Sequence, residues 1–268
     1  MALTEHKFNR KAIWEKVETV QRLAPVSAST EYNLILKALL KGEMEPQGLM
    51  PWSSNYTFLV RIVADNDINL LGIYKPGDGE RPLWDFPDQT LSLREFTSYL
   101  ISQVLGWPKI PPTVIRDGTH GIGSVQHFID AEYEAHYFNM RDMPDFIEDF
   151  RQMALFDFIA NNADRKGGLC LKGIDDQIWA IDHGLTFHTE PKLRTVIWEF
   201  SDEPIADPYL QDLTRLQEQM EGLELCQVLA DLISPREIEA FKKRINLLVS
   251  TGQFPALSPG RNVPYPPI

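Results

Sequence analysis

The chain has 268 residues, of which 43% are hydrophobic and 24% charged, enough for one large domain or two closely packed lobes. Its formal net charge of −12 argues against binding to nucleic acid or to anionic membrane surfaces, because like charges repel. No apolar stretch approaches the roughly 20 residues that a membrane span needs, and the N-terminus lacks the apolar core of a signal peptide. We therefore expect a cytoplasmic protein without nucleic-acid partners or membrane insertion.

The first half of the sequence predicts two helices and then a mainly β region. Apolar residues at helical spacing predict the helices, while β-branched and aromatic stretches around turn residues predict strands. The predicted elements are helices around 13–20 and over 31–40, strands over 56–63 and 70–75, a helix over 93–105, and strands over 113–116 and 124–129. The first two strands flank the turn at Asp65-Asn66-Asp67 and should form a hairpin.

The second half is predicted to be mainly helical. A long apolar helix ends at about Ala160, and Ser234 with Glu237 forms a capping box before the last helix. The other predicted elements are a hairpin of strands 169–172 and 178–181 and helices over 210–233 and 236–249. From Phe254 onward, five prolines predict a segment without regular structure.

Two aspartates frame the second predicted hairpin. Asp164 lies in the polar loop that ends the apolar helix, and Asp182 follows the hairpin in Ile181-Asp182-His183-Gly184, where the glycine should let the backbone turn. Because the hairpin folds the chain back, we expect both carboxylates to face one spot. Phosphoryl transfer needs one carboxylate to accept the proton of the attacking hydroxyl and another to hold a metal ion. Each aspartate alone would more simply be a loop or turn residue.

Lys75 and Glu95 are the matching candidates in the first half. Lys75 closes an apolar strand and could reach the phosphates of a nucleotide, or it could simply be a solvated strand end. Glu95 could pair with Lys75 from the following helix, or it could complete a capping box with Ser92. Both alternatives stay open at this point.

Two further stretches could contact a nucleotide. Ser53, Ser54 and Asn55 lie between predicted strands and could hydrogen-bond phosphate, although a plain turn is nearly as good an interpretation. Backbone groups from Gln126 onward precede the second half, where a hinge between lobes would bind adenine. The sequence contains no Walker motif, so a P-loop fold is disfavoured.

The stretch Asn-Ala-Asp-Arg-Lys-Gly-Gly, followed by Ile-Asp-His-Gly, resembles the catalytic and metal motifs of phosphatidylinositol 3-/4-kinase-like proteins. It is similar to those of secretory-pathway kinases of the Golgi casein kinase type. More closely, the segments 75–106, 161–168 and 182–198 resemble a bacterial family of predicted phosphatidylinositol-kinase-related proteins, and the resemblance spans about 42–245.

The resemblance implies an α+β, bilobal protein-kinase-like fold, with a mainly β N-lobe that contains one key helix and a mainly helical C-lobe. Asp164 would be the catalytic base, Asp182 the ligand of Mg²⁺ or Mn²⁺, Lys75 the phosphate lysine and Glu95 its helix partner. We expect a helical extension over 1–41, a nucleotide-binding N-lobe over 42–130, a catalytic C-lobe over 131–253 and a proline-rich tail over 254–268.

Two positions depart from the kinase pattern. Leu169 stands where a metal-binding asparagine would fall, which leaves the second ligand to Glu95, Asn161 or Asn162, or leaves none. Lys166 replaces a histidine and could neutralise phosphate charge or stay solvated.

The leading hypothesis is an ATP- and metal-dependent phosphotransferase that acts on a soluble protein or small-molecule hydroxyl. The alternatives are a non-catalytic nucleotide-binding pseudokinase or interaction module, and a nucleotidyl transferase. Phosphoinositide head groups usually require clustered basic residues, which the acidic chain lacks. Lys192 and Arg194 could bind an acidic substrate locally, or they could lie in a solvated loop.

Overall fold

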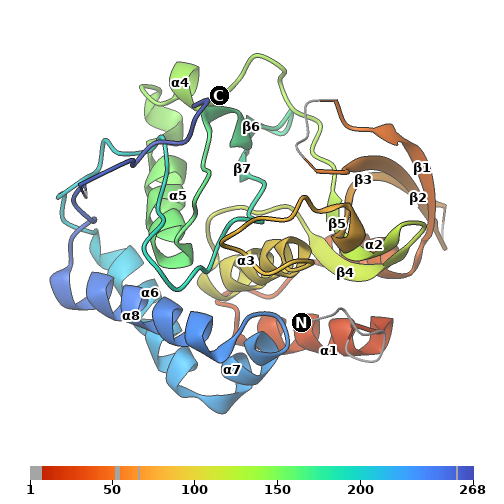
Figure 1. Cartoon of the computed structure of the whole chain (residues 1–268), viewed down its shortest axis with the longest axis horizontal. Helices are drawn as coiled ribbons and strands as arrows, with labels where there is room; N and C mark the ends of the chain where they lie inside the picture. Colours follow the sequence, from red (N-terminus) through yellow and green to blue (C-terminus); the bar gives the residue numbers. More distant parts are fainter. Residues whose placement is uncertain (1–7, 52–54, 66, 258) are drawn as a thin grey trace.

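The structure, a computed structural model, describes residues 8–51, 55–65, 67–257 and 259–268. Five antiparallel strands form one sheet, and the helices lie on one side of it and beyond it (Figure 1). The strands are β1 (Glu43–Leu49), β2 (Phe58–Ala64), β3 (Ile68–Pro76), β4 (Thr113–Gly118) and β5 (Gly121–His127). The chain is therefore mixed α+β, as the sequence predicted.

The sheet has the order β1-β2-β3-β5-β4, so β3 is its central strand. The predicted hairpin of β2 and β3 is confirmed, with Arg61 opposite Leu71. At the end of β3, Lys75 lies opposite Ser124 of β5. The neighbouring Gly123 has no room for a side chain, because a Cβ there would lie 2.2 Å from the carbonyl oxygen of Lys75. Glycine thus lets β5 pass close to the strand that carries Lys75.

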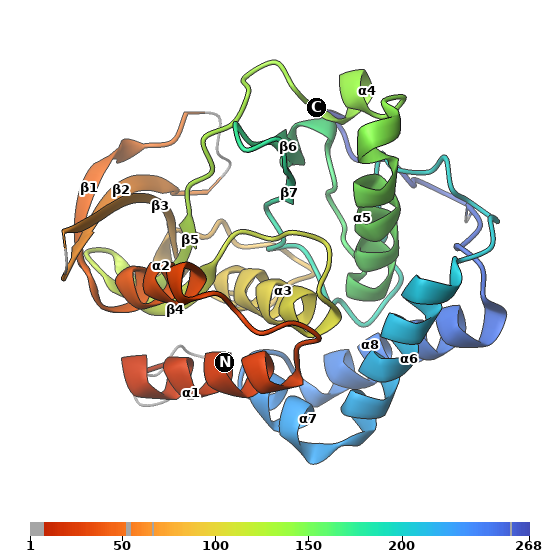
Figure 2. The same cartoon turned by 180° about the vertical axis from the view of Figure 1, so that it is seen from behind.

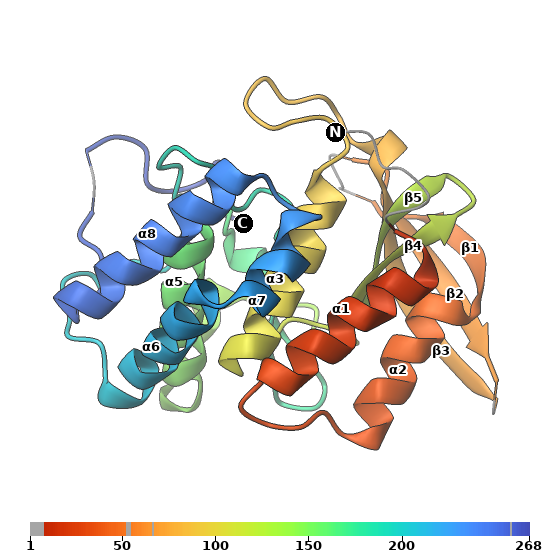
Figure 3. The same ribbon diagram turned by 90° about the horizontal axis from the view of Figure 1, so that it is seen from below.

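Three helices pack near the sheet: α1 (Arg10–Leu23), α2 (Thr30–Lys41) and α3 (Leu91–Leu105). All three were predicted, although α3 begins two residues before the predicted start. Almost every residue of α3 is buried, because it packs on β4 and β5 and also contacts α1 and α6 (Figure 3). A helix covered on all sides can hold a side chain rigidly between the sheet and the helical half.

The helical half contains the other helices and a short hairpin. These are α4 (Tyr137–Met140), α5 (Ile147–Ala160), α6 (Asp207–Glu221), α7 (Leu223–Ala230) and α8 (Pro235–Thr251), with strands β6 (Cys170–Lys172) and β7 (Ile178–Ala180) and 3₁₀ turns η1 (Gly77–Gly79), η2 (Pro144–Phe146) and η3 (Gly167–Leu169). Seen from behind (Figure 2), α6 and α8 lie beside each other at the end of the molecule away from the sheet. The predicted second hairpin is confirmed.

One predicted helix is two. The expected helix over 210–233 breaks at Gly222, which takes an extended conformation between α6 and α7. The capping box of Ser234 and Glu237 at the start of α8 is confirmed. Residues 254–257 and 259–268 contain no helix or strand, as expected, but Phe254 is buried against Phe200. Among the described residues, no helix has both the length and the apolar character needed to cross a membrane.

Candidate functional site

Lys75 brings three separate parts of the chain together. Its ammonium Nζ lies 2.9 Å from Oε2 of Glu95 in α3 and 2.8 Å from Oδ1 of Asp182 after β7. The Glu95 side chain is 1% exposed, whereas that of Asp182 is 51% exposed. The sheet, the buried helix and the turn after β7 therefore meet at one cation.

The charges of this trio support one another. Burial alone would lower the pKa of Lys75, but the carboxylates of Asp182 and Glu95 raise it above its ordinary value. The Lys75 ammonium in turn lowers the pKa of Asp182, although solvent at its half-exposed carboxylate weakens this effect. Lys75 is therefore a cation and Asp182 an anion at neutral pH.

Glu95 does not cap its own helix. The backbone N–H groups of Leu91 and Ser92 at the start of α3 donate to the carboxylate of Glu80, at 3.2 and 3.0 Å. Glu95 instead uses Oε2 for Lys75, and its Oε1 accepts a hydrogen bond of 3.0 Å from the backbone N–H of His183. Of the two sequence interpretations, the capping box with Ser92 is wrong, and the ion pair with Lys75 is present.

The turn after β7 owes its shape to Asp182. Its φ of 59° lies in the left-handed region, which aspartate enters more readily than most residues. The expectation that Gly184 supplies the unusual backbone is wrong. Its φ is not in that region, and a Cβ there would meet the Leu91 side chain at an ordinary 3.4 Å.

Asp164 lies in the loop after α5, partly exposed. Its Oδ2 is 3.0 Å from Nζ of Lys166, and its backbone N–H donates to Oδ1 of Asn162. Burial raises the pKa of Asp164; the Lys166 ammonium opposes this increase, and the negative charge of Asp182 adds to it. The negative charge of Asp182 thus contributes to the raised pKa of Asp164, and the expectation that both carboxylates face one spot stays a prediction.

A buried guanidinium that the sequence reasoning missed fastens this loop. Arg165 and Asp157 of α5 are both fully buried, with Nε 3.0 Å from Oδ2. Arg165 Nη1 donates to the carbonyls of Leu169 at 3.2 Å and Ile181 at 2.8 Å, and Nη2 lies 2.6 Å from Nε2 of His183. One side chain therefore holds the loop of Asp164 against the turn of Asp182.

His183 is a buried histidine that contacts Arg165 through Nε2, while its buried Nδ1 has no hydrogen-bond partner among the described residues. Because a guanidinium only donates, Nε2 of His183 must be the acceptor from Arg165, so its imidazole is neutral. Burial, with the nearby positive charge of Arg165, keeps the pKa of His183 well below its usual range. The sequence did contain a signal for this cluster: Asp157 is an acid between Phe156 and Phe158 in an otherwise apolar helix.

The amides proposed as metal ligands are occupied by protein contacts. Asn161 Nδ2 donates to the carbonyls of His188 and Glu190, and its Oδ1 accepts from the N–H of Lys192. Asn162 bonds Asp157 through Nδ2 and the Asp164 N–H through Oδ1. Both side chains therefore order the loops around Asp164 rather than point at a shared ion.

The other residues proposed to contact a nucleotide from the first half are Ser53, Ser54, Asn55 and Gln126. Ser53 and Ser54 are outside the described residues. Asn55 Oδ1 accepts from the N–H of Arg81 at 2.9 Å. Gln126 lies opposite Ile73, and its side-chain amide donates to Thr113 at 2.9 Å. The side chains of Asn55 and Gln126 thus serve internal contacts.

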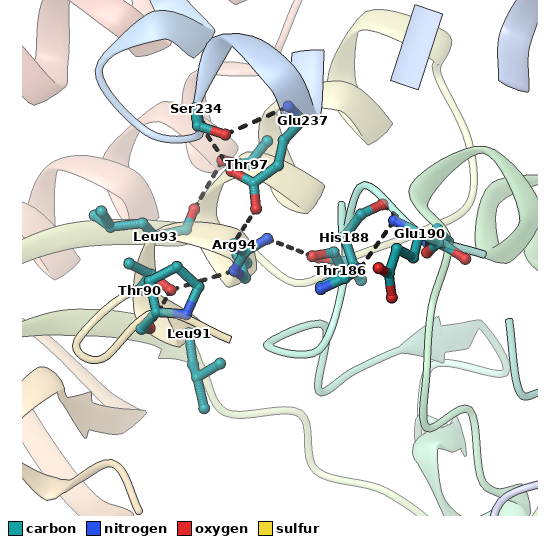
Figure 4. Close-up of polar contacts among 12 residues, drawn as sticks. Thr90, Leu91, Leu93, Arg94, Thr97, Thr186, His188, Glu190, Ser234 and Glu237 are labelled. Carbon is teal, nitrogen blue, oxygen red and sulfur yellow. Dashed lines mark hydrogen bonds and ion pairs between the residues drawn. The ribbon is translucent and has the colours of Figure 1, made fainter. Parts of the chain in front are cut away.

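A second buried arginine joins the site to the helical half (Figure 4). Arg94 of α3 is 1% exposed; its Nη2 lies 2.5 Å from Oε1 of Glu237 in α8, and its Nη1 donates to the carbonyl of Thr186 at 2.6 Å. Arg94 and Glu95 are neighbours on α3. This helix therefore binds the segment after Asp182 at two positions, the His183 N–H and the Thr186 carbonyl.

Lys192 also bridges the two halves. Its Nζ lies 2.9 Å from Oδ2 of Asp85 and 5.0 Å from the ring centre of Trp84, in the loop between β3 and α3. Both partners of the ion pair are mostly buried. The expectation that Lys192 lies in a solvated loop is therefore wrong.

A comparison of sequences finds a relative that matches most of the chain. The chain is 37% identical over 264 residues to "Protein Rv2133c" of Mycobacterium tuberculosis, with 85% of this chain and 93% of that protein covered. No model of a known protein family matches the chain.

Two solved structures share its fold. The Golgi casein kinase with Mn/ADP bound superposes with a TM-score of 0.55 and 15% identity, over 90% of this chain and 81% of the other. Hydra Fam20 with sugar gives a TM-score of 0.53 and 11% identity, over 88% and 94%. At such low identity the likeness establishes a protein-kinase-like fold and nothing about substrate.

Proposed function

The chain belongs to the family of Protein Rv2133c, and within that family we propose that it is an ATP- and metal-dependent phosphotransferase. The observation that carries the proposal is the contact of Lys75 with both Glu95 and Asp182. In a kinase fold, a strand lysine paired with a helix glutamate positions the nucleotide phosphates, and an aspartate after the hairpin binds the metal ion. These three residue types stand in those three places here.

Asp182 and Lys75 are the residues that would hold the metal–nucleotide complex. The half-exposed carboxylate of Asp182 is the hard oxygen ligand that Mg²⁺ and Mn²⁺ prefer. Among the described residues, no group of three or more His, Cys, Asp or Glu side chains forms a ready metal site. This donor set suits Mg²⁺, which is usually bound by one or two carboxylates plus phosphates and water. When bound, the ion neutralises charge on the phosphates.

Asp164 is the proposed catalytic base. The acceptor hydroxyl attacks the γ-phosphorus, a new O–P bond forms, the bond to the β-phosphate oxygen breaks and ADP leaves. The hydroxyl proton passes to the Asp164 carboxylate. Lys166, paired with Asp164 at 3.0 Å, keeps that carboxylate ionised and is suited to meet negative charge on the transferred group.

Leu169 supports a second candidate, a pseudokinase that binds nucleotide without turnover. Its side chain is apolar, and its carbonyl accepts from Arg165. The amides of Asn161 and Asn162 are engaged elsewhere, so the proposal assigns no second protein ligand. A nucleotidyl transferase on the same fold stays a third candidate. Membership in a bacterial phosphatidylinositol-kinase-related group is also a proposal, supported by the motif around Asp164.

One experiment separates the candidates. Purified protein is incubated with Mg²⁺ or Mn²⁺ and ATP labelled at either the γ or the α position, and thermal shift is measured in parallel. A kinase incorporates or releases only the γ label, and Asp164→Asn abolishes this while keeping the thermal shift. Incorporation of the α label identifies a nucleotidyl transferase. A thermal shift with neither label transferred identifies a pseudokinase. Lys75→Met should lose the shift, and absence of a shift already in the wild type refutes the nucleotide site.

The division into a helical extension (1–41), an N-lobe (42–130), a C-lobe (131–253) and a tail (254–268) stays a proposal, as does a cytoplasmic location. The position of Lys75 in β3 and of Asp164 after α5 supports a boundary between them. The acceptor in this proposal is a protein or small-molecule hydroxyl.

A further inference from the structure

The last residues of the described chain return to the loop of Asp164. After Phe254 the chain crosses the helical half and ends beside α4 and β6 (Figure 1). On this path the carbonyl of Asn262 accepts hydrogen bonds from the Thr195 backbone N–H and from Trp198 Nε1, each at 3.0 Å. The carbonyl of Pro267 accepts from the Gly167 N–H at 2.7 Å. We call Thr195, Trp198 and Gly167 the tail track.

The tail track is part of the frame around the proposed base. Thr195 pairs in parallel with Arg165, the residue after Asp164. Gly167 follows Asp164 by three residues, and a Cβ on it would lie 2.8 Å from the Phe138 ring. Glycine at position 167 therefore avoids a clash with Phe138, whereas a Cβ there would lie at an ordinary 3.5 Å from the Pro267 carbonyl oxygen.

These contacts recognise a polypeptide main chain. All three donors bind backbone carbonyls, so these hydrogen bonds do not involve the side chains of residues 262–268, and the prolines contribute by restricting the backbone. Pro264, Pro266 and Pro267 have no N–H, so they need no acceptor from the surface, and proline restricts the segment before it binds. The side chain of Tyr265 is 83% exposed, with the Arg261 guanidinium 6.0 Å from its ring centre. The segment bends at residues 263 and 265–266 and has a cis peptide bond between Tyr265 and Pro266, so it follows a bent path over the track. A proline-rich segment suits such a track, because its prolines reduce the ordering entropy lost on binding.

We propose that the tail track is a binding site for a proline-rich polypeptide that follows the bent path of residues 262–268, and that these residues occupy it as an internal competitor. A partner segment would bind where 262–268 now lies, beside Asp164. The assignment of that partner as phosphoacceptor rests on the proposed kinase function; the binding site itself does not.

Two full-length variants test the competition. In the first, residues 262–268 are replaced by glycine and serine, which removes the preformed segment and leaves the track unchanged. In the second, Gly168→Cys and Ile268→Cys are combined. A Cβ at position 168 would lie 4.0 Å from Cγ2 of Ile268, so the two positions are neighbours and oxidation tests whether a disulfide locks the tail in place. The single cysteine variants control for pairing with the buried Cys170.

The probe is a fluorescent peptide with the sequence of residues 259–268, followed by anisotropy. We expect the glycine–serine variant to bind it about tenfold or more tightly than the wild type, because an occupied site reduces apparent affinity by the open fraction. The oxidised lock should not bind it, and reduction should restore wild-type binding. Trp198→Phe in the glycine–serine background should weaken binding several-fold.

Equal binding to the oxidised lock and to the glycine–serine variant would overturn the proposal, because the peptide would then bind elsewhere. Absence of binding to every variant would overturn it too and would make the tail contacts structural packing alone. Thermal shift with Mg²⁺ and ATP is recorded on the same samples. Absence of that thermal shift in the wild type and in all variants would refute the proposed nucleotide binding. It would not affect the conclusion about peptide binding.

Discussion

Replacing Arg165 with methionine should destabilise the protein more than any exposed ion-pair change. The guanidinium is fully buried and bonds Asp157, two carbonyls and His183. Methionine fills similar space but leaves the fully buried Asp157 carboxylate without its cation. Breaking a buried pair in this way typically costs about 3–5 kcal/mol. For a domain of this size that corresponds to a fall in melting temperature of roughly 6–20 °C.

The matched control is Arg61→Met. Arg61 also forms a short ion pair, with Nη2 2.6 Å from Oε2 of Glu45, but both side chains are more than 40% exposed. Exposed pairs contribute about 0–1 kcal/mol. Urea unfolding followed by fluorescence, with thermal melts of both variants, gives the comparison. If Arg165→Met loses no more stability than Arg61→Met, the reasoning that burial makes the Arg165 network essential is refuted.

A double variant keeps the test informative if Arg165→Met is too unstable to purify. Asp157→Leu combined with Arg165→Met removes both charges, so no ion is left buried alone. Replacing a whole buried pair by apolar residues is often close to neutral. We expect the double variant to lose less stability than the sum of the single changes, by about 0.5–3 kcal/mol. Additive losses would mean that the two side chains act independently.

Three further predictions concern charges near the site. Because the pKa of the buried His183 is lowered, it stays neutral in the folded protein, whereas in the unfolded chain it gains a proton below about pH 6.5. The free energy of unfolding should therefore decrease as the pH is lowered, by up to ~1.4 kcal/mol per pH unit. His183→Gln should flatten this slope between about pH 7.5 and 5.5 in urea unfolding. Lys166 lowers the raised pKa of Asp164, so Lys166→Met should move the acid limb of the pH–rate profile for γ-label transfer to higher pH; an unmoved limb contradicts this. Glu237→Gln keeps the cap of α8 but leaves Arg94 unpaired, so thermal melts should show a loss of about 3–5 kcal/mol.

Local sequence patterns predicted most of the helices and strands. They also placed Lys75 at the end of a strand and Asp182 after the second hairpin. The β-branched and aromatic residues on either side of the turn residues were enough for the β2–β3 hairpin, because its strands are joined by a short turn and their register follows from it. The break at Gly222 was not predicted, because the apolar spacing continues from α6 into α7. Periodicity reports which faces are buried and does not report a change in helix direction.

The charged contacts of the site were less predictable, because their partners are distant in sequence. Arg94 and Glu237 are 143 positions apart, and each alone resembles an ordinary helix residue. Glu95 had two interpretations in the sequence, a capping box and an ion pair with Lys75. Its contacts with Lys75 and with the His183 N–H, both distant in sequence, decide between them. The helix start did not need Glu95, because Glu80 from the preceding loop supplied the cap.

The structure shows what depends on Leu169, the residue at the position where the kinase pattern has an asparagine. In this chain the geometry of the loop does not depend on that side chain, because the Leu169 carbonyl and the Ile181 carbonyl are both held by Arg165. In the proposed kinase site, a leucine at this position would supply no ligand, which would leave the half-exposed carboxylate of Asp182 as the main protein donor to the metal ion. One carboxylate binds a divalent cation weakly unless phosphate oxygens complete the coordination. Cation and nucleotide are therefore expected to bind as a unit, with the geometry set by Lys75, Glu95 and Asp182 before either arrives.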